Sequence, residues 1–83
     1  MSSILIRYIG VTLKNWAGKD EEKMVIEEPV SVTDVLHRLE ERHGKMPLPF
    51  SSLIILVNGR SAKLEALLHG NETIILTPLV GGG

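Results

Sequence analysis

The 83-residue sequence contains no cysteine, which excludes a disulfide, a thiolate metal site and a cysteine nucleophile. It also lacks an excess of either charge, since nine basic and ten acidic residues give a formal net charge of −1. Neither nucleic acid nor an anionic membrane is therefore expected as a partner. No apolar run reaches the ~18 residues of a membrane span, and the first residues lack the basic region of a secretory signal. We therefore expect a cytoplasmic protein.

Length and composition fit a single packed domain. The chain is 43% hydrophobic and 23% charged, which is close to ordinary globular usage. A chain of 83 residues has room for one core of modest stability. No internal repeat, linker or second domain is visible in the sequence.

The first part of the chain predicts two paired strands. Residues 4–9 are rich in β-branched side chains and form the first strand, and residues 24–27 form the second. Between them, residues 11–17 are expected to make a short helical turn. Ile4, Ile6 and Tyr8 share one wholly apolar face of the first strand, and the side chains predicted to face inward in the other two segments are Val11, Leu13, Trp16, Met24 and Ile26.

The strongest helix signal covers residues 32–43. Ser31 and Asp34 have the spacing of a capping box, in which the Ser31 oxygen can accept from the Asp34 N–H and the Asp34 carboxylate lies where the helix dipole favours an anion. Apolar residues then recur at i, i+3, i+4 and i+7, which makes one buried stripe: Val32, Val35, Leu36 and Leu39. Gly44 can adopt the left-handed conformation that closes a helix.

The second half of the chain predicts three more strands. Residues 53–57 are continuously apolar, which is typical of a strand covered on both faces, and we expect them to form the central strand. Asn58 and Gly59 favour a type I′ turn, because that turn needs positive φ at both central residues. Residues 60–63 then return as an edge strand, the next five residues are too few to assign, and residues 73–77 form the last strand.

This order of elements favours an α+β fold of the β-grasp, or ubiquitin-like, type. In that architecture a mixed sheet carries one main helix packed on one face. We place the β-grasp domain at residues 1–78 and interpret residues 79–83 as a flexible C-terminal glycine tail.

Three consecutive glycines, Gly81, Gly82 and Gly83, follow the last strand almost directly. Glycine has no Cβ, so its backbone can enter a narrow channel and its terminal carbonyl carbon stays open to attack. Such a tail suits chemistry on a carboxylate. The alternative is an inert terminus, since chain ends commonly tolerate change.

These features together resemble the MoaD/ThiS family of ubiquitin-like sulfur carriers over nearly the whole chain. The resemblance rests on the first strand, the single amphipathic helix, the Val-Asn-Gly-Arg segment at residues 57–60, the turn at residues 70–72, and the strand that runs into the glycines. Length and residues 11–18 are closer to MoaD, the small subunit of molybdopterin synthase. The tail itself is equally similar to that of ThiS.

The resemblance implies that the protein is a carrier rather than an enzyme, with no cofactor of its own. An ATP-dependent activating enzyme of the MoeB/ThiF kind would adenylate the Gly83 carboxylate, and a persulfide-derived sulfur would displace AMP to leave a thiocarboxylate. Gly81 and Gly82 would give the tail access to the enzyme. The sulfur would pass to a large synthase subunit or another acceptor in cofactor biosynthesis, with molybdopterin favoured over thiamine.

The resemblance also implies a partner-docking surface beside the tail. Its residues would be Tyr8, Pro78, Leu79 and Val80. Ser61 and Thr77 depart from the apolar side chains that the family usually carries on the sheet face where partners dock. The identity of the partner, and the choice of pathway, stay open.

Two other functions use the same residues. The protein could be a ubiquitin-like modifier that is joined through Gly83 to lysines of target proteins, or a plain β-grasp interaction module with inert glycines. A histidine-based metal site is not expected. His37 and His43 are six residues apart, about 240° around a helix, and so face different ways.

Overall fold

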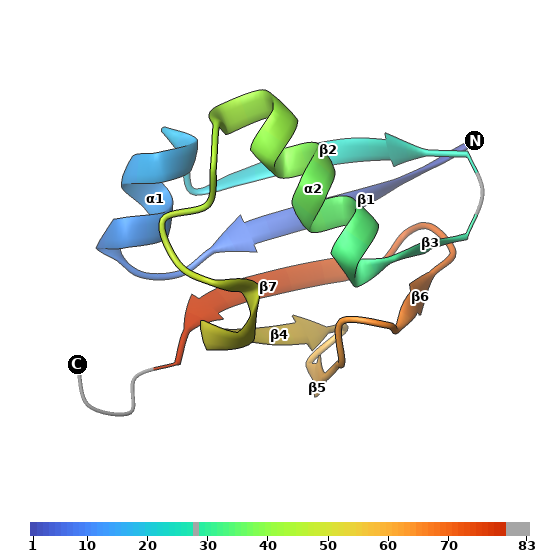
Figure 1. The fold of residues 1–83 in the computed structure, drawn as a ribbon. Helices are drawn as coiled ribbons and strands as arrows, with labels where there is room; N and C mark the ends of the chain where they lie inside the picture. Colours follow the sequence, from blue (N-terminus) through green and yellow to red (C-terminus); the bar gives the residue numbers. More distant parts are fainter. Residues whose placement is uncertain (28, 80–83) are drawn as a thin grey trace.

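The computed structural model describes residues 1–27 and 29–79 and has the predicted α+β architecture. Its elements, in chain order, are β1 (Ser2–Tyr8), α1 (Val11–Ala17), β2 (Glu21–Ile26), β3 (Val30–Ser31), α2 (Val32–His43), a 3₁₀ turn (Phe50–Ser52), β4 (Leu53–Val57), β5 (Arg60–Ser61), β6 (Leu67–Leu68) and β7 (Thr73–Pro78). Figure 1 shows α2 lying across the sheet of longer strands, with α1 at one end of it.

The longer strands form one mixed sheet. Within the described residues this sheet has five strands in the order β2, β1, β7, β4, β5, while β3 pairs separately with β6. β1 and β7 run parallel, and the other neighbours are antiparallel. One main helix packed on one face of such a sheet defines the β-grasp fold, so the prediction of fold class is confirmed.

The central strand is β7, and the prediction that residues 53–57 hold this position is wrong. β7 pairs with β1 on one side and with β4 on the other. The continuous apolar run of β4 has a different cause. Ile55 is buried under the helices, whereas Ile54 and Leu56 are half-buried on the opposite face of the sheet. Apolar residues on that second face therefore reproduce the pattern of a central strand.

Strand alternation and the helix stripe together build the core. In β1, β2 and β7 the even-numbered apolar residues point toward the helices, as predicted for the first two. The largest fully buried side chains are Tyr8, Ile4, Ile6, Leu13, Ile26, Leu36, Leu39, Leu68, Ile74, Leu76, Val32 and Val35. The predicted inward faces of β1 and α2 are thus confirmed.

The N-terminus of α2 is confirmed in detail. The Asp34 N–H donates to Ser31 Oγ at 3.0 Å, and the Ser31 N–H donates to Asp34 Oδ2 at 3.4 Å. Both bonds satisfy backbone donors that a helix start leaves without intrahelical partners. The helix ends at His43, and Gly44 follows with φ 93° and ψ 179°, so it has the positive φ that suits glycine but not the left-handed conformation that was predicted.

Two predictions in the first part of the chain are wrong. β2 begins at Glu21, three residues earlier than expected, because an edge strand can carry charged side chains that alternate into solvent. Val11 is 74% exposed rather than buried. α1 has only seven residues and turns Leu13 and Ala17 inward, which leaves its first residue outside the core.

The turn between β4 and β5 has the predicted backbone. Asn58 has φ 51° and Gly59 has φ 83°, so both central residues are in the left-handed region that a type I′ turn requires. The returning strand β5 covers only residues 60–61, two fewer than predicted.

Gly59→Val is expected to lower the free energy of unfolding by about 1–3 kcal/mol, because a β-branched residue resists positive φ. A Cβ at this position would meet nothing within 4 Å, so the effect is conformational rather than steric. Gly59→Asn is the matched control, since asparagine tolerates positive φ. Urea denaturation curves that coincide for the valine variant and the wild type would contradict this account of the turn.

Candidate functional site

The last strand carries the chain to the glycine tail. Pro78 is half-buried and lies opposite Leu53, and the next backbone N–H, that of Leu79, donates to the Ser52 carbonyl at 2.8 Å. The sheet and the 3₁₀ turn that precedes β4 therefore hold the backbone as far as Leu79. The tail residues Val80, Gly81, Gly82 and Gly83 lie outside the described residues.

The connection from β1 to α1 passes directly beside the end of β7. The Ile9 N–H donates to the Leu76 carbonyl at 2.9 Å. Gly10 follows with φ 95°, and a Cβ there would lie 3.4 Å from Pro78 Cδ. The positive φ favours glycine here, and the contact with Pro78 places the start of α1 beside the end of β7.

Tyr8 does not lie on a docking surface, and that prediction is wrong. Its side chain is 1% exposed, because strand alternation places it with Ile4 and Ile6 on the face covered by the helices. Its hydroxyl donates to Glu22 Oε2 at 2.5 Å. Burial, together with this bond to a carboxylate, raises the pKa of Tyr8 far above its ordinary value.

Glu22 is the centre of a hydrogen-bond cluster that the sequence did not predict. Its side chain is only 7% exposed. It accepts from the Tyr8 hydroxyl, from Arg42 Nη1 at 2.9 Å, and it pairs with His43 Nε2 at 2.6 Å. Burial alone would raise the pKa of Glu22, but the bonds from Tyr8, His43 and Arg42 outweigh it and hold the pKa below its usual range.

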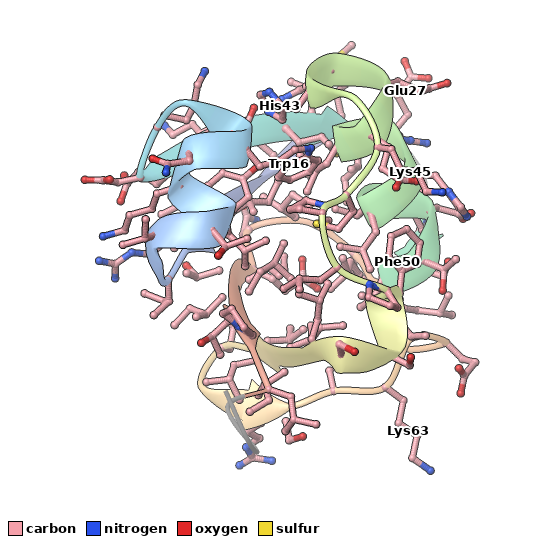
Figure 2. The ribbon with its side chains drawn as sticks, turned by 60° about the vertical axis from the view of Figure 1, so that its left-hand side comes forward. Trp16, Glu27, His43, Lys45, Phe50 and Lys63 are labelled. Carbon is pink, nitrogen blue, oxygen red and sulfur yellow. The ribbon has the colours of Figure 1, made fainter. Side chains whose placement is uncertain are left out.

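Trp16, on α1, packs against this cluster. Its ring meets Tyr8 edge-on at 6.1 Å and His43 at 5.2 Å between centroids, and its Nε1 donates to the Gly44 carbonyl at 3.1 Å. Figure 2 shows Trp16 and His43 close together between α1 and the end of α2. The cluster therefore ties both helices to the two strands at the edge of the sheet. Its role is structural, because it faces the core.

The face of the sheet away from the helices is apolar along its middle. Leu5, Ile54, Leu56 and Ile75 alternate with the buried residues of their strands and are half-buried. Cross-strand pairing places Ile75 between Arg7 and Leu56. We call these four apolar side chains the open-face stripe. Sequence reasoning missed them, although the apolar residues at both alternating positions of β4 and β7 were the signal.

Ser61 and Thr77, the two departures from the family pattern, lie on this same face. Ser61 pairs with Leu56 at the edge of the sheet, and Thr77 pairs with Ile54 near the tail. Apolar side chains of the open-face stripe therefore lie directly beside both polar residues.

His37 and His43 make their contacts in different parts of the structure. His37 Nδ1 lies 3.4 Å from Glu40 Oε1, and its ring packs edge-on against Phe50, whereas His43 belongs to the Glu22 cluster. The residues that the structure describes contain no group of three or more potential metal ligands. In that same part of the chain, neither helix has the length and apolar composition needed to cross a bilayer.

A ubiquitin-like fold with a strand that leads into a glycine tail defines a small class of proteins. The model of the ThiS family matches residues 8–83, and the chain belongs to that family. No curated protein sequence matches the chain significantly.

Several solved structures share the fold. A protein described as molybdopterin converting factor, subunit 1, from Pyrococcus furiosus has a TM-score of 0.78 at 22% identity, with 94% of this chain and 98% of that chain covered. SAMP1 from Haloferax volcanii has a TM-score of 0.78 at 21% identity, with coverages of 99% and 100%. The small archaeal modifier protein 1 from Methanosarcina acetivorans has a TM-score of 0.75 at 26% identity, with coverages of 100% and 98%.

Proposed function

We propose that the protein is a sulfur carrier whose Gly83 carboxylate is adenylated and converted to a thiocarboxylate. The observation that carries this proposal is that the backbone is held in place until just before the glycine tail. The sheet holds the backbone up to Leu79, and only Val80 and three glycines separate that point from the carboxylate. Membership of the ThiS family supports the same chemistry.

The reaction needs three steps, with the carrier as substrate. The Gly83 carboxylate attacks the α-phosphate of ATP, and pyrophosphate leaves. The terminal sulfur of a persulfide then attacks the acyl carbon and displaces AMP, and a thiol reduces the resulting acyl disulfide to release the thiocarboxylate. The attack on the acyl carbon in the second step needs an unhindered carbonyl, which Gly83 and its glycine neighbours provide.

The open-face stripe is the surface that we propose for protein partners. Leu5, Ile54, Leu56 and Ile75 form an apolar strip on the sheet that leads to the tail. An activating enzyme of the MoeB/ThiF kind and a sulfur acceptor would each bind this strip in turn. Molybdopterin synthesis is our preferred pathway, and a cytoplasmic location fits the composition.

Mass spectrometry tests the proposal directly. Incubation with the cognate activating enzyme, ATP and a persulfide donor is expected to add about 16 Da at Gly83, the difference between oxygen and sulfur. The reaction without ATP is the control. A protein that gains no sulfur with any activating enzyme from its own organism is not a sulfur carrier.

The second candidate is a ubiquitin-like protein modifier. Similarity to the small archaeal modifier protein 1 structures favours it, and conjugation would start from the same adenylate. Recovery of the chain joined through Gly83 to lysines of other proteins, without any thiocarboxylate, would support this function instead. If deletion of Gly82 and Gly83 left biological activity intact, the protein would be a plain interaction module.

A further inference from the structure

One edge of the five-stranded sheet is formed by β2, whose only neighbour in the described sheet is β1. Figure 1 shows β2 along this outer edge. The edge of a sheet presents backbone N–H and C=O groups that can pair with a strand of another chain. The pairing of β2 with β1 decides which residues of β2 present these groups.

The odd-numbered residues of β2 turn their backbone N–H and C=O groups to the open edge. The Tyr8 N–H donates to the Asp20 carbonyl at 2.8 Å, and directly opposed residues of an antiparallel pair alternate between bonded and non-bonded positions. In the register of β1 and β2, the bonded positions of β2 are therefore its even-numbered residues. On the other side of β1, the Asn71 N–H donates to the Ser3 carbonyl, which agrees with this alternation. The residues that face the open edge are Glu21, Lys23 and Val25.

The two halves of this edge differ in how they are protected. In the first half, the Lys23 carbonyl accepts from Arg42 Nη1 at 3.1 Å, and the charged side chain of Glu22 points inward. Both features hinder pairing with a further strand. Val25 lies near the other end of β2, and no turn, loop or side-chain hydrogen bond of the described residues reaches its backbone. Its side chain is 56% exposed, so the edge is open there.

The charges on either side of Val25 complement each other in a symmetric pair. Lys23 precedes Val25 by two residues, and Glu27 follows it by two. Antiparallel pairing of β2 with the β2 of a second copy, centred on Val25, would place the two valines opposite each other. Each Lys23 would then lie opposite the Glu27 of the other copy. Val25 and Glu27 also line one hollow of about 340 Å³, which leaves room for side chains of that copy.

The neighbouring registers are less favourable. A pair centred on Lys23 sets two ammonium groups opposite each other, and a pair centred on Met24 sets Glu21 opposite Glu27. A pair centred on Glu22 would use the Lys23 carbonyl, which is already bonded to a side chain of α2. Charge and backbone access therefore select the register centred on Val25.

We infer that two copies of the chain associate through antiparallel pairing of β2 with β2, centred on Val25, into one continuous sheet. Only a short strand from each copy takes part, and interfaces of small area are weak, so the dimer is expected at high protein concentration. Val25 lies opposite Ser3, at the start of β1, whereas Pro78 adjoins Gly10, beyond the end of β1. The dimer therefore leaves the end of β7 uncovered in both copies.

Sedimentation equilibrium of the full chain, at concentrations from about 10 µM to about 1 mM, tests this inference. The wild type is expected to change from monomer toward dimer within this range. Val25→Lys sets like charges opposite each other at the symmetry axis and should raise the Kd of the dimer by about tenfold or more. Leu67→Lys is the matched control, because Leu67 is 59% exposed and lies on β6, outside the five-stranded sheet. It should dimerise like the wild type.

An exchange of charges tests the register. Lys23→Glu alone and Glu27→Lys alone each set like charges opposite each other twice in the dimer, so each should raise the Kd by about tenfold or more. The double variant with both substitutions restores opposite charges and the wild-type net charge, and its Kd should return close to the wild-type value. Circular dichroism checks that each variant is folded.

Three results would overturn the inference. The first is a wild type that stays monomeric up to about 1 mM, which would leave the edge of β2 to an unlike partner. The second is the same Kd for Val25→Lys and Leu67→Lys, which would place the dimer contact on another surface. The third is a double variant that dimerises as weakly as Lys23→Glu and Glu27→Lys do singly, because the two charges would then not face each other.

Discussion

Glu22→Ala is expected to lower the free energy of unfolding by about 3 kcal/mol or more, a large share of what so small a domain has. The carboxylate is 7% exposed and serves Tyr8, Arg42 and His43 together. Alanine would leave the Tyr8 hydroxyl without its acceptor inside the core, and a buried unsatisfied donor costs about 1–3 kcal/mol by itself. Arg42 is half-exposed and can return to water, which limits the total. Urea denaturation at neutral pH measures the loss.

Glu21→Ala is the matched control for this substitution. Glu21 is the neighbouring residue of β2, and its carboxylate lies 3.5 Å from Arg7 Nε on the surface, where both side chains are about half exposed. An exposed ion pair of this kind contributes about 0–1 kcal/mol. Equal losses for the two variants would mean that burial of the Glu22 carboxylate has no special energetic role.

The stabilisation by Glu22 should also depend on pH in one direction. Its pKa in the folded protein lies below the ordinary value of 4.5, so the folded state releases its proton more readily than the unfolded state does. The contribution is therefore fully present above the unfolded pKa and is lost as pH falls through the folded pKa. The stability difference between wild type and Glu22→Gln should shrink below about pH 4.5. A difference that grows on acidification would show that the carboxylate is not held in its charged form.

Features set by neighbouring residues were predictable from the sequence. The capping box of Ser31 and Asp34 involves residues three apart, and the turn at Asn58 and Gly59 depends on their own φ preferences. The same holds for the inward faces of β1 and α2, because periodicity alone assigns them. These local features suffice for the β-grasp fold, since few compact arrangements accommodate their order.

Features set by pairing between distant segments were not predictable in the same way. Whether β4 or β7 lies at the centre depends on which strands pair, and both carry apolar residues on both faces. Glu22 lies before the second strand as predicted, at residues 24–27, and its neighbours are charged. Its alternation with Met24 and Ile26 was the one local sign that it points inward. The residues that satisfy it, on α2 and β1, come from elsewhere in the chain.

In the candidate site, too, the features that depend on neighbouring residues were predictable from the sequence, and those that depend on distant segments were not. The tail chemistry was read from Gly81, Gly82 and Gly83 and the family resemblance, and it stays a proposal because these residues lie outside the described part of the chain. The surface around the tail could not be assigned from the sequence. Tyr8 was assigned to the docking surface from the family resemblance but is buried, whereas Val11 was expected in the core and is exposed.

Gly82→Ile is expected to lower the rate of thiocarboxylate formation roughly 100-fold or more, while leaving the free energy of unfolding nearly unchanged. An isoleucine next to the reacting residue would obstruct a channel that accepts bare backbone, and it would restrict the φ and ψ values that the tail can adopt. The last backbone bond of the described residues is made by Leu79, three positions earlier, so the fold should not sense the change. Addition of one alanine after Gly83 should have the same effect, because it moves the carboxylate away from the reactive position.

Gly59→Val supplies the opposite control. Gly59 lies in the turn after β4, and Val57 of that strand pairs with Ile74 near the start of β7, far along the sheet from Pro78. This variant should lose stability and yet gain sulfur at the wild-type rate under conditions where it is folded. Gly82→Ile should keep stability and lose the reaction, as followed by denaturation curves and by the rate of the mass increase. If Gly82→Ile is adenylated and sulfurated at the normal rate, glycine is not required for access to the enzyme, and the tail must be recognised through other residues.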